Sequence, residues 1–331
     1  MQLIDKLINQ ETLTKAESSV LLNNITTGIY NDSQIVVVVT ALQMRSITAN
    51  ELIGFRDALL EMSIKIDLSV GDCIDVCGTG GDGKNTFNIS TITAFVLATG
   101  GYKVVKHGNY GVSSFCGSST MLEHLGYKFS TNEANLQEQL DTNNICFLHA
   151  PLFHPCLKRV SAIRTELGIR TFFNFLGPLV NPIQPNLQLT GVFNLKVARL
   201  YKDILTNERK AFNIVHSMDG YDEVSLTAPV KLFSETSEQL LYPEELTGQI
   251  IVEDDLFGGH NIQESEKIFR AIIEGKGSAI QNEVIKINTA LGIKCFKPEL
   301  LIEEAQKEAE EILKSGKVAQ IVKNVIKISQ K

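Results

Sequence analysis

A glycine-rich segment, Gly78-Thr79-Gly80-Gly81-Asp82-Gly83, follows the apolar stretch 73–77 and precedes a second apolar stretch that begins near Asn88. Glycines allow positive φ angles and let backbone N–H groups approach an anion without a Cβ in the way. A helix that starts after such a turn adds the positive end of its dipole. Ser90 and Thr91 would add hydroxyl donors in the first turn of that helix. The order of strand, glycine turn and helix therefore predicts a phosphate-binding loop.

The segment differs from two common phosphate-binding motifs. No Gly-Lys-Ser/Thr closes it, as a P-loop would require. It also departs from a dinucleotide fingerprint, because Asp82 precedes the last glycine and several polar residues delay the helix. An ordinary tight turn would explain these glycines equally well, so the interpretation depends on other segments.

A second polar segment follows the apolar pair Val104-Val105. It combines a cation, an imidazole, an amide and several hydroxyl groups, the last of them near the start of another expected helix. These residues are Lys106, His107, Asn109, Ser113, Ser114 and Ser118. Helix capping explains any single serine as well, and His107 could be a satisfied polar residue in a turn. In open α/β sheets, however, ligands bind at the carboxyl ends of the strands, so the cluster predicts a second part of an anion site.

Two adjacent carboxylates, Asp222 and Glu223, follow the apolar pair Ile214-Val215. Such carboxylates repel one another unless they are solvated or share a cation. Magnesium usually takes one or two carboxylates together with substrate phosphates and water. A solvated turn is the alternative, and the two predicted phosphate-binding segments favour a magnesium site.

The central segment 154–182 contains three arginines, Arg159, Arg164 and Arg170. The planar fork of a guanidinium suits a carboxylate. Surface ion pairing is the alternative for each, and composition does not choose among the three.

The elements that must position these residues follow two different patterns. Residues 1–65 predict helices, with possible capping boxes at Thr14/Glu17 and Thr48/Glu51. Residues 35–40 resemble a strand, but their flanks favour a helix. From about residue 66, short apolar runs alternate with helical segments, which indicates βαβ units. The predicted fold class is α/β, with a small α-helical domain and a larger α/β domain that has a mostly parallel central sheet.

Composition limits the possible functions. At about 150 residues per domain, 331 residues suggest two domains. A formal charge of -7 argues against a broad basic face for nucleic acid. No apolar run approaches the ~18 residues of a membrane span, and the first residues lack the features of a signal peptide. Six cysteines without a Cys-x-x-Cys pair predict a reduced, cytoplasmic protein.

The four segments resemble those of anthranilate phosphoribosyltransferases, in the same order and over nearly the whole chain. The most specific match runs from His154-Pro155 through Arg164-x-Glu166-Leu167-Gly168-Ile169-Arg170-Thr171 to Asn174-x-Leu176-Gly177-Pro178-Leu179-x-Asn181-Pro182. The resemblance implies transfer of the phosphoribosyl group from phosphoribosyl pyrophosphate to the amine of anthranilate, with release of pyrophosphate, in tryptophan biosynthesis. It also implies a homodimer, formed through a helical domain of residues 1–65 and 157–185. Residues 66–156 and 186–331 would form the α/β domain that binds phosphoribosyl pyrophosphate and magnesium.

The resemblance also assigns roles to individual residues. The residues expected to contact phosphoribosyl pyrophosphate are Gly78, Gly81, Asp82, Thr86, Asn88, Ile89, Ser90, Thr91, Lys106, Ser113, Ser114 and Ser118. Those expected on the anthranilate side are Gly78, His107, Asn109, Arg164 and Pro178. Magnesium is assigned to Ser90, Asp222 and Glu223. No residue is assigned as a general base.

The chain departs from the family pattern at three places. Tyr110 stands where the family commonly has arginine, and Ser119-Thr120 where it commonly has Ala-Asp. The Asn-Ala that usually follows the late Gly-Gly is not evident after Gly258-Gly259. Two rival functions are a pyrimidine nucleoside phosphorylase, which shares the fold, and a non-catalytic paralogue that binds nucleic acid.

Overall fold

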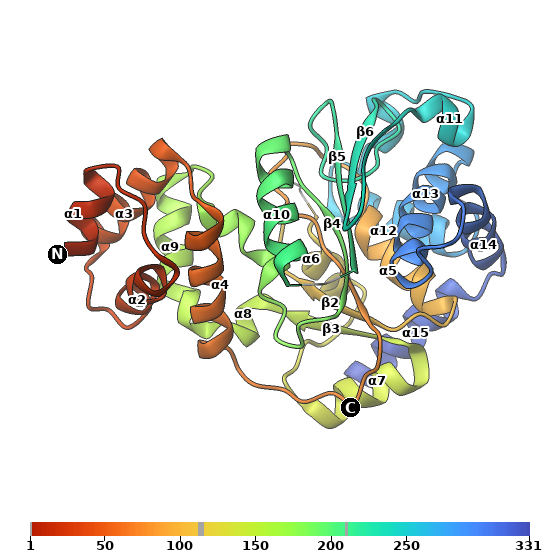
Figure 1. Ribbon diagram of the computed structural model, residues 1–331. Coiled ribbons are helices and arrows are strands. Elements are labelled where there is room, and N and C mark those ends of the chain that lie inside the picture. The colour runs from red at the N-terminus through yellow and green to blue at the C-terminus, as the bar shows by residue number, and fades with distance from the viewer. Residues whose placement is uncertain (1, 112–115, 209–210) are drawn as a thin grey trace.

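The computed structural model describes residues 2–111, 116–208 and 211–331. It consists of a helical part, at the left of Figure 1, and a larger part built around one sheet. The helical part contains α1 (Gln2–Ile8), α2 (Lys15–Thr26), α3 (Asp32–Arg45), α4 (Ala49–Met62) and α9 (Lys158–Leu167). The fold class expected from the sequence is thus confirmed.

Side chains at the helix starts explain where the first helices begin. Thr14 and Glu17 form the expected capping box, in which the Glu17 carboxylate accepts from the Thr14 N–H at 2.9 Å. Thr48 and Glu51 form another. Asn31 caps α3 by accepting from the Gln34 N–H at 2.9 Å. This cap makes a helix of the β-branched stretch 35–40, as the flanks predicted.

The sheet has seven strands in the order β3-β2-β1-β4-β5-β6-β7. The first five of these are parallel to one another, whereas β6 pairs antiparallel with β5, and β7 pairs antiparallel with β6. The strands are β1 (Ile74–Val76), β2 (Val104–Gly108), β3 (Ile145–His149), β4 (Leu187–Gly191), β5 (Ala211–Ser217), β6 (Val230–Ser234) and β7 (Glu238–Leu241). The chain leaves β1 toward β2 on one side and returns to β4 on the other, so the strand order reverses between β1 and β4. Such a switch point is where open α/β sheets bind ligands.

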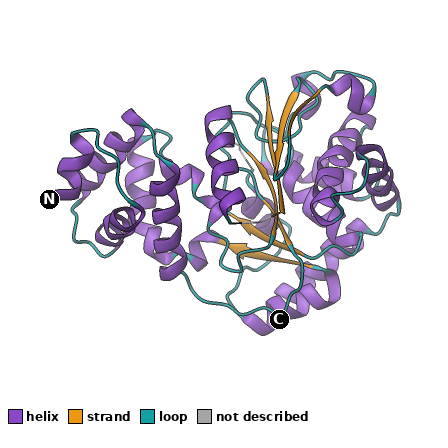
Figure 2. Cartoon of the chain, in the orientation of Figure 1, coloured by secondary structure: helices purple, strands orange, loops and turns teal. Residues whose placement is uncertain are grey.

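Helices cover the sheet, as Figure 2 shows. The longer helices of the α/β part are α5 (Ile89–Thr99), α7 (Glu133–Asn143), α10 (Leu195–Asn207), α12 (Ile262–Ile273), α13 (Ala279–Phe296), α14 (Ile302–Lys314) and α15 (Val318–Ser329). Short helices are α6 (Ser118–His124), α8 (Ala150–Phe153) and α11 (Pro243–Thr247). One buried core joins α5 and α13 to the sheet. No helix in the described part of the chain has the length and apolar character of a membrane span.

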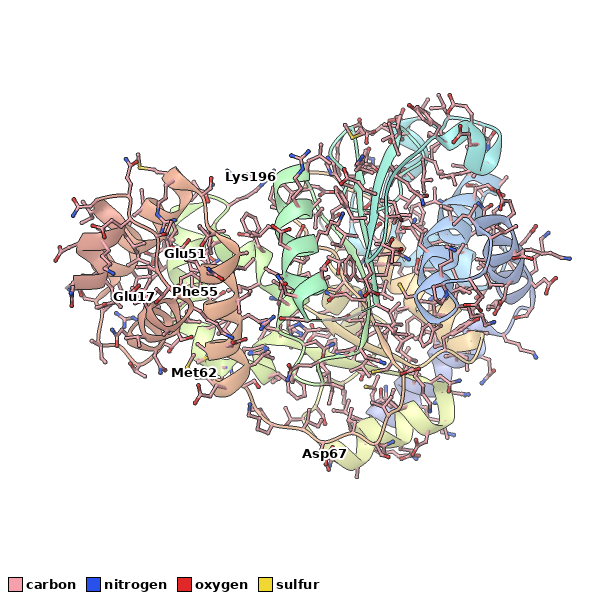
Figure 3. All side chains as sticks on the ribbon, viewed as in Figure 1. Glu17, Glu51, Phe55, Met62, Asp67 and Lys196 are labelled. Carbon is pink, nitrogen blue, oxygen red and sulfur yellow. The ribbon has the colours of Figure 1, made fainter. Side chains whose placement is uncertain are left out.

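A second core connects the helical part to the face of the sheet that carries α10. Within it, Phe55 of α4 stacks on Phe172, with ring centroids 4.6 Å apart. The Tyr201 hydroxyl of α10 donates to the Phe175 carbonyl. Figure 3 shows Phe55 on α4 and Lys196 at the top of α10. The two parts of the chain are therefore held together by apolar packing as well as by polar contacts.

The central segment 154–182 contains short regular turns after α9. It includes 3₁₀ turns at Phe172–Phe175 and Gly177–Leu179. The Gly177 carbonyl accepts a hydrogen bond from the Val180 N–H, which closes the second turn. This turn brings Pro178 close to the carboxyl ends of β1 and β2.

Candidate active site

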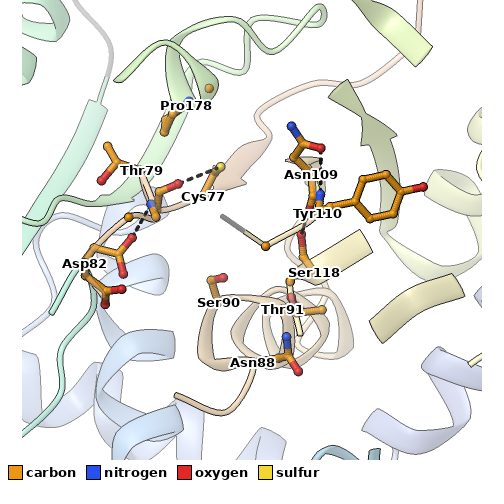
Figure 4. Close-up of a pocket in the computed structure, with 18 of the residues that line it drawn as sticks. Cys77, Thr79, Asp82, Asn88, Ser90, Thr91, Asn109, Tyr110, Ser118 and Pro178 are labelled. Atoms are coloured by element: carbon orange, nitrogen blue, oxygen red, sulfur yellow. Dashed lines mark hydrogen bonds between the residues drawn. The ribbon is translucent and has the colours of Figure 1, made fainter. Parts of the chain in front are cut away.

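A cavity of about 220 Å³ lies at the carboxyl ends of β1 and β2, next to the start of α5. All the described residues predicted for substrates or metal line it. They are Gly78, Gly81, Asp82, Thr86, Asn88, Ile89, Ser90, Thr91, Lys106, His107, Asn109, Ser118, Arg164, Pro178, Asp222 and Glu223. Ser113 and Ser114 lie outside the described residues. Figure 4 shows the glycine loop, the start of α5 and the segment around Asn109 facing one another across the cavity.

The glycine loop has the backbone conformation that its sequence requires. Gly80, Gly81 and Gly83 have φ angles of 62°, 75° and 80°, which side chains other than glycine rarely adopt. The Gly80 N–H donates to Asp222 Oδ2 at 2.7 Å. A Cβ on Gly78 would lie 2.4 Å from the same oxygen. The loop therefore lies directly against the carboxylate pair.

The carboxylates form an acidic cluster with raised pKa values. Burial, and then the neighbouring Asp82, raise the pKa of Asp222 to about 7. Burial, and then Asp222 and Asp82, raise the pKa of Glu223 well above its usual value. Glu223 Oε1 accepts from the Ser90 N–H at 3.0 Å, whereas Oε2 is buried without a hydrogen-bond partner. A cation would relieve this repulsion and supply the missing partner.

The oxygen atoms of this acidic cluster suit a magnesium ion that is also coordinated by a bound substrate. No group of three or more His, Cys, Asp or Glu side chains among the described residues forms a ready-made metal site. Magnesium does not need one, because it commonly binds one or two carboxylates together with phosphate oxygens and water. Asp222, Glu223 and the Ser90 hydroxyl provide oxygen donors of this kind beside the phosphate loop.

Lys106 and His107 are the last residues of β2 before Gly108, and as strand neighbours they point to opposite faces of the sheet. The Lys106 ammonium donates to the Val76 carbonyl and lies 3.5 Å from Ser90 Oγ. His107 Nδ1 bonds to the Gly177 carbonyl at 3.0 Å and must therefore carry the proton. Burial, and then His154, lower the pKa of His107 to about 3. The imidazole is neutral near pH 7, and its buried Nε2, which has no protein partner, is left as an acceptor.

A second cavity, of about 500 Å³, adjoins the first on the side of the helical part. His107, Asn109 and Arg164 line both cavities, whereas Gly78 and Pro178 line only the first. The shared wall therefore carries an acceptor, an amide and a guanidinium.

The structure separates the three arginines. Arg159 pairs with Asp32 at 2.6 Å on the surface, and Arg170 lies 5.2 Å from the ring centroid of Phe193 and lines neither cavity. Arg164 alone of the three lines both cavities. Its Nε is buried without a partner, and burial lowers its pKa.

Contacts with α6 and β3 hold the second loop, the polar segment after β2, in place. The Asn109 carbonyl accepts from Ser118 Oγ and from the Ser119 N–H, both at 3.2 Å. Tyr110, the departure from the family pattern, donates its hydroxyl to Glu123 at 3.0 Å. Its ring meets that of His149 edge to face. Tyr110 thus ties the second loop to α6 and β3.

Residues 253–260 lie along the far side of the glycine loop. The Phe87 N–H donates to the Leu256 carbonyl at 3.0 Å, and the Gly258 N–H donates to the Asn85 carbonyl at 2.8 Å. A Cβ on Gly258 would lie 2.4 Å from the Thr86 carbonyl oxygen. This segment, which we call the strap, fixes Thr86 at the cavity.

Sequence reasoning missed several lining residues, among them Lys84, Phe173 and Asn174. Lys84 could have been found as a cation within the glycine-rich segment. Phe173 and Asn174 lie in the central segment, but only the folded chain shows that they face the cavity.

Comparisons with known proteins agree with this geometry. Residues 70–319 match the model of the glycosyl transferase family, a/b domain, and residues 1–63 match that of its helical bundle domain. The chain is 50% identical to the anthranilate phosphoribosyltransferase of Flavobacterium johnsoniae over 319 residues. The aligned region covers 95% of each of the two chains. The chain belongs to the anthranilate phosphoribosyltransferase family. Its activity class is accordingly that of a glycosyltransferase.

Two solved structures of anthranilate phosphoribosyltransferases show the same fold. The enzyme from Thermus thermophilus is 27% identical and superimposes with a TM-score of 0.93 over 100% of both chains. The enzyme from Saccharomyces cerevisiae, in complex with PRPP and Mg, is 27% identical, with a TM-score of 0.90 over 99% of this chain and 97% of that one. Both parts of the chain, and not the sheet alone, therefore match this family.

Proposed function

We propose that the chain transfers the 5-phosphoribosyl group of phosphoribosyl pyrophosphate to the amine of anthranilate, in tryptophan biosynthesis. The observation that carries the proposal is the pair of adjoining cavities with a shared wall of His107, Asn109 and Arg164. The first cavity has the glycine loop and the carboxylates, and so suits a sugar diphosphate with magnesium. The second has a guanidinium that can pair with a carboxylate. The yeast relative was solved with PRPP and Mg, which supports the same use of the first cavity here.

In this proposal, each substrate has its own residues. Phosphoribosyl pyrophosphate contacts the residues around the glycine loop, α5 and the second loop that were assigned to it above. Anthranilate lies against His107, Asn109 and Arg164. Gly78 and Pro178 also contact anthranilate in this proposal, although both line only the first cavity.

The chemistry follows from the charge that develops as the bond from ribose C1 to pyrophosphate breaks. Ser90, Asp222 and Glu223 would hold magnesium, which would supply Lewis-acid stabilisation of the negative charge on the leaving group. Backbone N–H groups of the glycine loop stabilise the same negative charge. The wall residues orient the neutral arylamine toward C1. His107 is a weak base, because its pKa is lowered to about 3, and no general base is assigned.

We also propose a homodimer formed through the helical part. Ile8 of α1, with 58% of its surface exposed, and Met44 of α3, with 82%, are large apolar side chains open to solvent. Light scattering of the purified protein tests this, since a monomer at micromolar concentration would contradict it. The proposed domains are residues 1–65 with 157–185 and residues 66–156 with 186–331. All six cysteines are free, which supports a cytoplasmic location.

The loss of anthranilate fluorescence tests the activity directly. With phosphoribosyl pyrophosphate and magnesium, the purified protein should consume anthranilate, and omission of magnesium should slow the reaction strongly. Phosphorolysis of thymidine, or retention on DNA at moderate salt, without any loss of anthranilate would favour one of the rival functions and contradict the proposal.

A further inference from the structure

One cation at the first cavity has no role in the proposed function. Lys84 lines this cavity two residues after Asp82. Its N–H donates to Asp82 Oδ1 at 3.0 Å, which fixes its main chain at the end of the glycine loop. Its ammonium lies 3.1 Å from Glu253 Oε1 of the strap and 4.5 Å from the ring centroid of Tyr221. The side chain therefore begins at the phosphate loop and ends on a neighbouring carboxylate.

The partner of Lys84 holds it only weakly. The Glu253 side chain is 68% exposed. An exposed ion pair adds little to stability, because water solvates both charges well when they separate. The lysine stem is flexible and its ammonium can donate in several directions. Lys84 can therefore change partners at little cost.

The positively charged side chains that line the first cavity differ in how firmly they are held. Among the described residues, Lys84, Lys106 and Arg164 are the lysines and arginines that line it. Lys106 is held by the Val76 carbonyl inside the sheet. Arg164 also lines the second cavity, on the acceptor side. Of the three, Lys84 alone combines a position on the glycine loop with a weakly held ammonium.

We infer that Lys84 is a further donor-binding residue, whose ammonium exchanges Glu253 for the diphosphate group when the sugar diphosphate binds. The inference rests on the proposed function, since it names an additional residue of the same donor site. Glu253 then acts as the resting partner of Lys84, and the Tyr221 ring lies beside the ammonium in this resting position. The alternative is that the Lys84–Glu253 pair only ties the strap to the glycine loop.

The two readings predict different effects for the two partners. If Lys84 binds the diphosphate, Lys84→Gln should weaken binding of Mg²⁺-pyrophosphate by about tenfold, because a charge-assisted contact is lost. Glu253→Gln should bind it at least as tightly as the wild type, because the competing carboxylate is neutralised. If the pair is only a tie, both substitutions should weaken binding equally.

Calorimetric titration with Mg²⁺-pyrophosphate, at low and moderate salt, measures these effects on the full chain. We expect Lys84→Gln to reduce the salt dependence of binding, Lys84→Arg to restore most of the affinity, and the double variant to resemble Lys84→Gln. The KM for anthranilate should change little in any of them. Equal weakening in Lys84→Gln and Glu253→Gln, or unchanged binding in Lys84→Gln, overturns the inference.

The outcome for the wild type separates this inference from the proposed function. If the wild type binds Mg²⁺-pyrophosphate and consumes anthranilate while Lys84→Gln behaves identically, only the role of Lys84 is lost. If the wild type neither binds pyrophosphate nor consumes anthranilate, the proposed function fails and the inference fails with it. Should Lys84→Gln unfold, the comparison of Lys84→Arg with Glu253→Gln still decides, because weaker binding in Glu253→Gln alone overturns the exchange.

Discussion

The backbone of Gly191 passes so close to Asp222 that a Cβ on Gly191 would lie 1.3 Å from the Asp222 carbonyl oxygen. Gly191 ends β4, the strand next to β1 at the switch point of the sheet. The Gly191 carbonyl also accepts from the Thr79 N–H of the glycine loop at 2.9 Å. Gly191 thus joins the phosphate loop to the carboxylate loop.

Gly191→Ala should therefore impair both stability and catalysis. The new methyl group meets backbone rather than a movable side chain, so the carboxylate loop must shift. We expect a loss of about 1–3 kcal/mol in the free energy of unfolding, measured in urea, and a raised requirement for magnesium in the fluorescence assay. Gly71→Ala is the matched control, because a Cβ there meets nothing within 4 Å. Equal behaviour of the two variants would contradict the role of Gly191.

We predict that ionisation of Asp222, which favours metal binding, lowers the stability of the metal-free protein. The pKa of Asp222 in the folded protein is raised to about 7. Asp222 therefore stays protonated in the folded state at pH values at which it is already ionised in the unfolded state. Between these two pKa values the unfolded state binds fewer protons, and the contribution of Asp222 to stability falls as the pH rises. The metal-free protein should lose thermal stability from pH 5.5 to pH 8, and Mg²⁺ with pyrophosphate should restore it most at pH 8.

The variant Asp222→Asn tests this prediction. The amide oxygen of Asn can still accept from the Gly80 N–H, and no charge needs to be buried. We expect a smaller loss of thermal stability between pH 5.5 and pH 8 than in the wild type, no stabilisation by magnesium, and a fall in activity of at least about a hundredfold. A wild-type protein whose response to magnesium did not change with pH would count against the raised pKa.

Much of this site could be predicted from local sequence. The glycine loop, the start of α5 and the capping boxes each depend on residues a few positions apart, and all of them occur as expected. The flanks of residues 35–40 predict a helix there, and in the structure the Asn31 cap, rather than the β-branched centre, decides the conformation. Where an element depends on residues only a few positions apart, the sequence alone predicts it.

The contacts that tune the site depend on distant segments and could not be predicted in this way. Lys84 and Glu253 are 169 positions apart, and nothing local links Gly191 to Asp222. The choice among Arg159, Arg164 and Arg170 depends on how α9 and the residues that follow it pack. The low pKa of His107 depends on burial in the folded chain. These features arise from tertiary packing.

We predict that substitution of Glu51 lowers the stability of the fold and leaves substrate binding unchanged. The side chain is fully buried, and its carboxylate accepts from the Leu13 N–H at 2.9 Å, from the Thr48 N–H at 2.8 Å and from Arg45. Burial opposes ionisation, but the hydrogen bonds outweigh it and hold the pKa of Glu51 below its usual value. Glu51→Ala should lower the free energy of unfolding by about 3–5 kcal/mol, with both KM values unchanged in the remaining folded protein.

Denaturant unfolding measures this effect, with Glu61→Ala on the exposed face of the same helix as the control. Because the pKa of Glu51 is lowered, its contribution to stability is present above the unfolded value and is lost as the pH falls through the folded one. The difference between wild type and Glu51→Ala should therefore shrink in acid. A difference that grew in acid would contradict the assigned ionisation.

We predict that substitution of Arg164 affects the KM for anthranilate and the KM for phosphoribosyl pyrophosphate differently. Its guanidinium lines both cavities and its buried Nε has no partner in the protein, which suits a guanidinium kept for a carboxylate ligand. Arg164→Ala should raise the KM for anthranilate by about 10- to 100-fold, because a charge-assisted contact is lost. The KM for phosphoribosyl pyrophosphate should change far less. Arg159→Ala removes a guanidinium from the same helix that pairs on the surface with Asp32, and steady-state kinetics should show little effect on either substrate. Equal increases in both KM values for Arg164→Ala would assign this residue to the architecture of the cleft rather than to the acceptor.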